Sequence, residues 1–450
     1  TANNNVAVGY DALGANTTAA DNTAVGYNSL SAVNTGAGST AVGKDALAAN
    51  TSGQNTAVGR DALTANTTGT ENVAMGVNTL DANTTGDYNI AVGTSALGAN
   101  TTADNNTAVG ANALLTTTTG ANNVAVGTEA LELNTAGNNT AVGYQAAEET
   151  TTGDFNVAVG SNAFEDNTTG AQNTAIGGYA LGNTTTANNN VAVGYIALNA
   201  NTTGASNVAV GAYALDANTT GTWHTAVGYN ALGAITTGNN GTAFGYEALK
   251  VATIGNNTAI GTQALTANTT GTGNTAVGQN ALDANTTASY NTAVGAGAAG
   301  TSTTAQRNTA VGYNALTAAT TGSDNVTMGY VAGAAITTGI ENTILGYYSG
   351  NAVTTTNYNT FVGSSAGQLN TAADNVAVGA RSFDANTTGT RNVAIGKSAL
   401  GANTTAADNT ALGYNSLILN TTGASNVAVG ANALDANTTA SYNTAVGTSA

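Results

Sequence analysis

Short apolar segments recur along the whole chain, and each of them ends at a glycine. There are 27 copies, which read Val, Thr or Ile, then usually Ala, then an apolar residue and the glycine, as in Thr23-Ala24-Val25-Gly26. Such residues favour strands. A second apolar segment, containing Leu30 in this copy, follows the glycine, and Asn-Thr-Thr-Gly-type turn residues complete the repeat. The pattern predicts two short strands per repeat, joined by turns.

The spacing of the glycines indicates how the repeats are arranged. Of 26 intervals, 22 are 17 residues long and four are 16. A unit this short cannot bury a hydrophobic face alone, so its neighbours must stack on it. We therefore expect an all-β fold, a single continuous parallel β-solenoid of about 27 coils over residues 1–450. Because the sequence starts and stops inside a repeat, we also expect it to be part of a longer chain.

Three consecutive coils break the pattern and indicate which side chains point inward. In each of them the usual strand Ala becomes larger and the usual Leu becomes Gly: Thr327 with Gly333, Ile344 with Gly350, and Phe361 with Gly367. Close-packed interiors penalise both voids and overpacking. We infer that this Ala and this Leu face each other inside the roll, so Leu215 is a predicted core residue.

Strand alternation then places the residues on either side of the Ala on the outer face. Val25, Val208 and Val210 belong to this set, which forms an apolar stripe larger than soluble monomers usually expose. Identical chains packed around a shared long axis are the economical way to cover it, and they could also join end to end. In the alternative, the valines line the interior and the alanines lie outside on a monomer.

Asparagine precedes the glycine by four residues in 24 of the 27 copies, as at Asn22. Stacked coils would align these side chains in a ladder of amides. His224, the only histidine, takes this position beside Trp223, the only tryptophan. It is either half of a catalytic pair or a replacement for asparagine, and we interpret it as the replacement.

Composition restricts the partners and the chemistry. The chain has no Cys or Pro, only 7% charged residues and a net charge of −17. The acidity argues against nucleic-acid binding, and no apolar run near 20 residues is present, so we expect no membrane insertion. The lack of Cys excludes thiol chemistry. These features are compatible with an extracellular, cell-surface or virion location.

Catalytic and metal-binding patterns are weak. Glu148 and Glu149 are adjacent, but a solvated turn explains them as well as a general acid and base does. Aspartates fall in the variable loop without the constant position that calcium-binding rolls require; they are Asp21, Asp104, Asp154, Asp324, Asp374 and Asp408. The glycines lack the Lys of a phosphate-binding loop. We expect no cofactor, no metal and no enzyme activity.

Tyrosine follows the glycine in ten coils and is the candidate binding residue. Examples are Tyr10, Tyr27, Tyr229, Tyr313 and Tyr414. A row of aromatic rings could stack on sugars, but the position also accepts Lys44, Arg60, Thr94 and Ala111, as an exposed turn position would. Separately, Asn-Thr-Thr at Asn16, Asn66 and Asn218 matches the N-glycosylation acceptor.

The repeat resembles known fibre proteins. Asn22-Thr23-Ala24-Val25-Gly26-Tyr27 and Asn274-Thr275-Ala276-Val277-Gly278 are similar to the head repeats of trimeric autotransporter adhesins. They are more similar still to the tandem N-T-A-V-G-Y-x-A-L repeats of bacteriophage tail fibres and bacterial surface fibres. The resemblance covers the whole chain and implies a left-handed roll, a homotrimer and attachment to a cell-surface glycan or receptor. The 17-residue coil is longer than the usual adhesin head repeat, and no coiled-coil stalk is present.

Three classes of function fit these observations to different degrees. The first is a structural fibre or adhesin shaft, supported by uniform repetition and by the resemblance. The second is an ice-binding or carbohydrate-binding β-solenoid, although the strand Thr alternates irregularly with Val. The third is an enzyme on a solenoid, which would need a local cluster of charged residues that breaks the repeat. The sequence favours the fibre.

Overall fold

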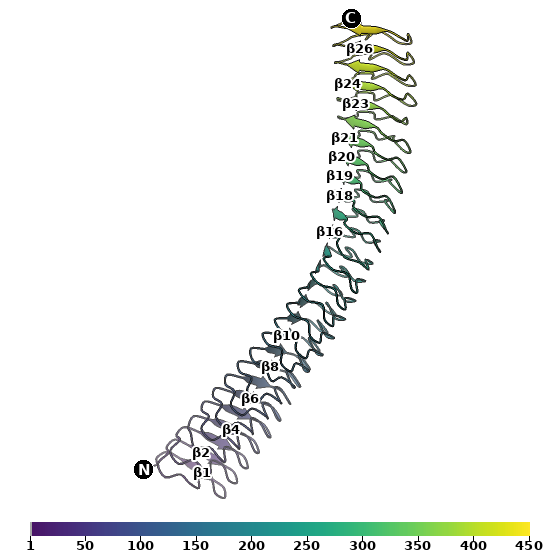
Figure 1. Ribbon diagram of the computed structural model, residues 1–450. Coiled ribbons are helices and arrows are strands. Elements are labelled where there is room, and N and C mark those ends of the chain that lie inside the picture. Colours follow the sequence, from purple (N-terminus) through teal and green to yellow (C-terminus); the bar gives the residue numbers. More distant parts are fainter. Residues whose placement is uncertain (1) are drawn as a thin grey trace. The chain divides into compact units, whose positions relative to one another are not determined.

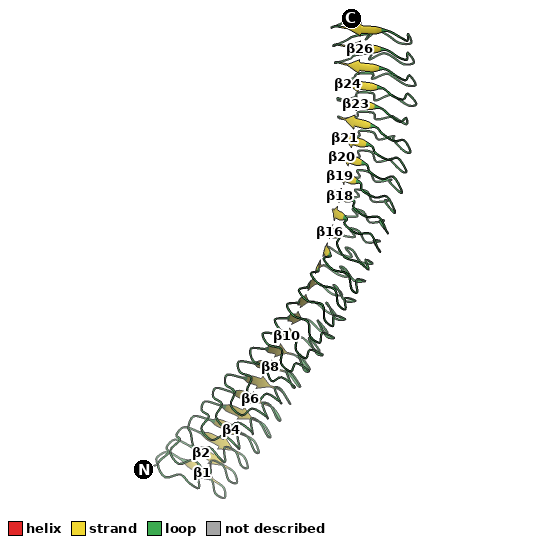
Figure 2. Ribbon diagram, viewed as in Figure 1, coloured by secondary structure: helices red, strands yellow, loops and turns green. Residues whose placement is uncertain are grey.

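The computed structural model describes residues 2–450, and within them the fold is all-β, without any helix (Figures 1 and 2). It is a parallel β-solenoid in which every strand has three residues. The strands are β1 (Val6–Val8), β2 (Thr23–Val25), β3 (Thr40–Val42), β4 (Thr56–Val58), β5 (Val73–Met75), β6 (Ile90–Val92), β7 (Thr107–Val109), β8 (Val124–Val126), β9 (Thr140–Val142), β10 (Val157–Val159), β11 (Thr174–Ile176), β12 (Val191–Val193), β13 (Val208–Val210), β14 (Thr225–Val227), β15 (Thr242–Phe244), β16 (Thr258–Ile260), β17 (Thr275–Val277), β18 (Thr292–Val294), β19 (Thr309–Val311), β20 (Val326–Met328), β21 (Thr343–Leu345), β22 (Thr360–Val362), β23 (Val376–Val378), β24 (Val393–Ile395), β25 (Thr410–Leu412), β26 (Val427–Val429) and β27 (Thr444–Val446).

The chain divides into two units, Thr1–His224 with β1–β13 and Thr225–Ala450 with β14–β27. Within each unit every strand pairs in parallel with the next one in the sequence. Equivalent residues lie opposite each other, as in Ala7↔Ala24 in the first unit and Ala276↔Ala293 in the second. The period of the sequence is therefore the period of the sheet.

The prediction of two strands per coil is wrong, because the segment after the glycine is a turn. The backbone there is left-handed at every second residue, with φ of 60° at Asn28 and 49° at Leu30, so it cannot be an extended strand. It still makes a ladder between coils, since the Leu30 amide donates to the Ala46 carbonyl at 3.0 Å. A left-handed leucine costs roughly 1–2 kcal/mol, which burial of its side chain, about 2 kcal/mol, offsets.

The glycine that ends each strand is required by the next coil. At Gly26, φ is 143°, and an added Cβ would lie 2.3 Å from the carbonyl oxygen of Gly43. A side chain there would force the two coils apart. The invariance of this position along the chain therefore reflects the close approach of successive backbones.

The interior contains the strand Ala and the turn Leu, as the exchange of volumes in the sequence indicates. In β4, Ala57 is fully buried between part-exposed Thr56 and Val58. Leu30 and Leu215 are fully buried too. In none of the 27 strands is the first or the last residue buried. This contradicts the alternative in which the valines line the interior.

The three irregular coils keep the same interior by exchanging volume between its two sides. A Cβ built on each turn glycine would lie under 3 Å from the strand side chain of its own coil: 2.9 Å for Gly333 and Thr327, 2.6 Å for Gly350 and Ile344, and 2.6 Å for Gly367 and Phe361. The three strand residues are fully buried. Each larger side chain occupies the space that a leucine fills elsewhere.

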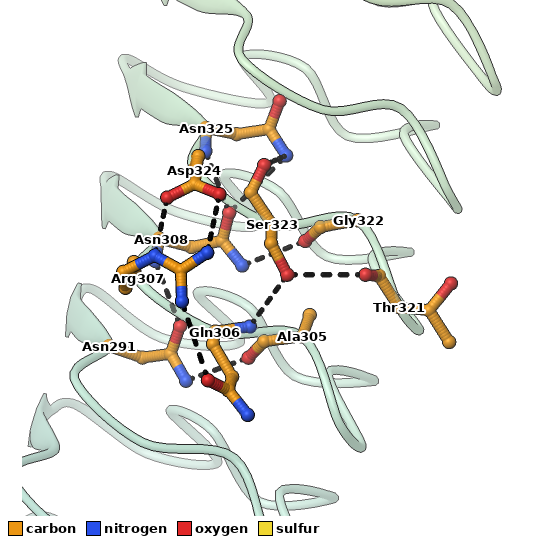
Figure 3. A network of polar contacts seen from close by, with 10 residues as sticks. All are labelled: Asn291, Ala305, Gln306, Arg307, Asn308, Thr321, Gly322, Ser323, Asp324 and Asn325. Carbon is orange, nitrogen blue, oxygen red and sulfur yellow. Dashed lines mark hydrogen bonds and ion pairs between the residues drawn. The ribbon is translucent and has the colours of Figure 1, made fainter.

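Asparagines before the strands form ladders that run through successive coils, and Ser39, His224 and Gly241 take the asparagine position in the other three coils. The backbone amide of Asn72 donates to Oδ1 of Asn55 at 3.0 Å, and its Nδ2 donates to the Gly86 carbonyl at 2.8 Å. The same pattern joins Asn291, Asn308 and Asn325 (Figure 3). Because both ends of each amide are used, buried polar groups at the strand entrance are satisfied.

A second asparagine ladder, which the sequence pattern assigned to a turn, lies inside the roll. Nδ2 of Asn83 donates to Oδ1 of Asn66 at 2.8 Å, and Nδ2 of Asn100 donates to Oδ1 of Asn83 at 3.0 Å. The ladder stops at Thr117, and there the buried Oδ1 of Asn100 has no partner. The run that ends at Asn100 is therefore satisfied internally but has an unpaired oxygen at its end, and Oδ1 of Asn218 is unpaired in the same way.

Candidate functional site

The outer face of the strands presents part-exposed or exposed residues in every coil. The residue before the glycine is apolar in all copies and part-exposed or exposed in every strand. It is 47% exposed at Met75 and 56% exposed at Phe244. Val25, Val208 and Val210 are half-buried members of this face. We call the last residues of strands β1 to β27 the outer apolar row. Val25 and Val210 belong to it, and Val208 is the first residue of β13 on the same face.

Exposed tyrosines form short stacks on the turn that follows the outer apolar row. Tyr10 stacks on Tyr27 with ring centroids 5.3 Å apart, and Tyr229 stacks on Tyr246 at 5.6 Å. Each partner is the tyrosine of the adjacent coil. Tyr10, Tyr27 and Tyr229 are thus members of local stacks rather than of one continuous row.

One parallel stack contains three rings. Tyr313 and Tyr330 lie 5.3 Å apart and Tyr330 and Tyr347 lie 5.5 Å apart, with interplanar angles of 14° and 18°. Tyr348 packs edge-on against Tyr347 at 4.6 Å. Tyr414 is 51% exposed and lies outside these stacks. Inner rings of a stack have both faces covered, so a flat ligand can reach only the end rings.

His224 lies in the asparagine ladder, where the sequence places it. It is 1% exposed, and its backbone amide donates to Oδ1 of Asn207 at 2.9 Å. The neighbouring Trp223 side chain is 63% exposed. The geometry supports the interpretation of His224 as a replacement for asparagine, because the imidazole is buried in the roll.

An acidic cluster was not anticipated from the sequence. Carboxylate oxygens of Glu129, Glu132 and Glu148 lie within 4.8 Å of one another. Burial raises the pKa of Glu132 and Glu148, and the charge of Glu129 raises both further. Glu148 faces glutamates of the preceding coil, a contact that the adjacent pair Glu148-Glu149 does not predict.

The variable loop carries ion pairs between coils. Arg307 contacts Asp324 through two hydrogen bonds of 2.6 and 2.8 Å (Figure 3), and Arg391 contacts Asp408 in the same way. The hydrogen bond from Arg307 lowers the pKa of Asp324. All four side chains are exposed, so each pair contributes little to stability.

The Asn-Thr-Thr sequons are poorly placed for glycosylation. Asn66 and Asn218 are fully buried in the inner ladder, and Nδ2 of Asn218 donates to Oδ1 of Asn201 at 3.0 Å. The nitrogen that would carry a glycan is thus bonded inside the roll. Asn16, which lies between β1 and β2, is only part-buried.

Comparisons with known proteins leave the family open. No protein-family model matches the chain, and the search of curated proteins gave no match. Over residues 2–450 the structure contains no helix of the length and apolarity needed to cross a membrane. Function must therefore be argued from the surface described above.

Proposed function

We propose that this chain is the shaft of an extracellular fibre, on a cell surface or a virion, and that its role is structural and adhesive rather than catalytic. In this proposal identical copies pack along their outer apolar rows. The observation that carries it is that this row is apolar in all 27 strands and buried in none. Soluble monomers rarely expose continuous apolar surface beyond a few hundred Å².

A further copy of the same chain fits this surface better than an unrelated partner. Parallel strands lie about 4.8 Å apart, so the outer apolar row repeats at that spacing. Only a partner with the same strand spacing stays in register over many coils. A second copy of this chain has that spacing because it has the same sequence. Closed symmetry around a common axis then covers the row of every copy. We take three copies and a left-handed roll from the resemblance to adhesin heads.

Charged substitutions in two neighbouring strands test the proposal. Val191, Val193, Val208 and Val210 are changed to Asp, and mass is measured by light scattering as the protein is diluted and warmed. The unaltered protein is expected at three times the 43.5 kDa chain mass. On warming, the variant should dissociate at a lower temperature than the unaltered protein. On dilution, it should already dissociate at a higher protein concentration, because the added charges face one another between copies. Its far-UV circular dichroism should not change.

A matched control adds charge to the loop instead. Ala205→Asp with Ser206→Asp places two carboxylates at positions where other coils already carry aspartate, such as Asp104 and Asp21. This control should dissociate like the unaltered protein. A monomeric unaltered protein, or equal effects of the two variants, would contradict the proposal.

Ice binding is the second candidate function, and one observation favours it. From β14 to β19 the first strand residue is Thr in six consecutive coils, and the hydroxyls of these residues have no protein hydrogen-bond partner among the described residues: Thr225, Thr242, Thr258, Thr275, Thr292 and Thr309. Such a row could order water. A monomer that shows thermal hysteresis in freezing experiments would favour this function over the fibre.

A further inference from the structure

A gap the size of one ring lies beside Tyr313, at the end of the three-ring tyrosine stack. The coil before Tyr313 carries Ala296 and Gly297 after its glycine, so it has almost no side chain at this level. A pocket of about 220 Å³ lies here, and its lining residues come from three successive coils: Gln279, Asn280, Ala296, Gly297, Tyr313 and Asn314. The volume is below the roughly 300–1,000 Å³ of drug-sized sites. It suits a single six-membered ring.

Tyr313 presents one free ring face to this gap. Its other face is covered by Tyr330 at 5.3 Å. A comparable end ring, Tyr27, is covered differently, because Nζ of Lys44 lies 6.0 Å from its centroid. Ala296 and Gly297, the residues at the level of Tyr313 in the preceding coil, supply neither an aromatic nor a cationic side chain. A ligand ring placed over Ala296 would therefore take the next position in the stack.

Neutral amides surround the gap. Gln279 and Asn280 lie on the side opposite Tyr313, and Asn314 lies over Gly297, where an added Cβ would come within 2.3 Å of its Oδ1. Oδ1 of Asn280 is buried and has no protein hydrogen-bond partner. Amide groups offer both donors and acceptors. One aromatic face ringed by amides, without any charged lining residue, matches a neutral polyhydroxylated ring.

We propose that this pocket binds a single pyranose ring of a neutral glycan. The apolar face of the sugar stacks on Tyr313, and its hydroxyls exchange hydrogen bonds with the amides of Gln279, Asn280 and Asn314. Gly297 keeps the floor of the pocket open. Nucleic acid is the less suitable ligand, because the lining has no cation to pair with phosphate and the net charge is −17. The site lies on the turn rather than the outer apolar row, so the proposal does not depend on assembly.

Ligand-observed NMR with defined probes tests the site in the full chain. Methyl glycosides of glucose, galactose, mannose and N-acetylglucosamine are titrated at millimolar concentrations, with adenosine as a flat aromatic comparison. We expect saturation transfer to at least one glycoside, strongest for the protons of its apolar face, with a millimolar Kd. Stronger binding of adenosine than of every glycoside would overturn the proposal.

Variants then locate the binding. Ala296→Tyr fills the gap with the residue that ten other coils carry at this position, so the coil should fold and glycoside binding should fall at least tenfold. Asn314→Ala should weaken binding several-fold. Tyr414→Ala removes an exposed tyrosine without such a pocket and should leave binding unchanged. Binding that survives Ala296→Tyr, or that Tyr414→Ala abolishes, would refute the assignment.

Discussion

A regular coil and an irregular coil of the second unit solve the same packing problem in opposite ways. In the coil of β17, the small Ala276 of the strand faces the large Leu282 of the turn, and both are fully buried. In the coil of β22, the large Phe361 faces Gly367, whose added Cβ would lie 2.6 Å from the ring. The filled volume is therefore a property of the pair, and neither position alone determines it.

The turn residue has nearly the same φ in both coils, so backbone conformation does not explain the glycine in the irregular coil. Leu282 has φ of 51° and Gly367 has φ of 57°. Leucine thus adopts the left-handed conformation that is often taken to require glycine. At Gly367 the residue is small because Phe361 needs the space, whereas Gly26 is small because the next backbone needs it. Glycine therefore occurs at two positions of the repeat for two different physical reasons.

The largest expected effect comes from placing a charge in a regular interior. Leu215→Asp buries a carboxylate in a core of alanine and leucine where no cation is available, and it should cost more than about 4 kcal/mol. The surrounding coils should open, which hydrogen exchange measured by mass spectrometry would detect as lost protection around β13.

The control for this change is Ser206→Asp in the same coil. Ser206 is exposed and has φ of 61°, and aspartate occupies the equivalent position at Asp21. The same charge outside the roll should leave protection unchanged. Equal protection in both variants would mean that Leu215 is not a core residue.

The second prediction converts the irregular coil into a regular one. Gly367→Leu overpacks the interior against Phe361 and should cost about 1–3 kcal/mol or more. Phe361→Ala leaves a cavity and should cost about 3–5 kcal/mol. The double variant restores the Ala and Leu pair of the other coils, so its cost should be well below the sum. Thermal or denaturant unfolding of the four proteins gives the coupling energy.

Ala310→Phe with Gly367→Leu serves as the matched comparison, because it changes the same residue types in coils that are not adjacent. Its effects should add, since the new phenylalanine does not face the new leucine. Additive effects in Phe361→Ala with Gly367→Leu would contradict the paired-volume account.

The sequence was sufficient to predict the solenoid and the side of the strand that faces inward. The repeat of 16 or 17 residues predicts that successive coils stack in register. In one coil Ile344 replaces the usual Ala and Gly350 replaces the usual Leu, and this joint change indicates that the two positions are in contact across the roll. The second strand was predicted wrongly because propensity and hydrophobicity do not report φ, and Leu30 is left-handed at 49°. The pocket beside Tyr313 was missed for a different reason. Its signal, a small residue pair between larger neighbours, becomes visible only once the coils are aligned in register.

The inner asparagine ladder gives the smallest predicted effects. In two of the three irregular coils its position holds Ile336 and Val353, and in the third it holds Asn370. In regular coils Asn66, Asn83 and Asn100 form an amide run. Asn83→Val leaves Oδ1 of Asn66 buried without its donor, and this should cost about 1–3 kcal/mol. Denaturant unfolding and local hydrogen exchange would measure the loss.

Thr117→Asn is the reverse test, because it extends the run where it now ends. The new amide can donate to Oδ1 of Asn100, which has no partner in the present structure. A gain of about 0.5–1.5 kcal/mol is expected, reduced by loss of the 2.7 Å bond from the Thr117 hydroxyl to the Asn134 carbonyl. If Asn83→Val were neutral while Thr117→Asn destabilised the coil, volume rather than amide pairing would govern this position. The regular and irregular coils would then differ only in how they fill space.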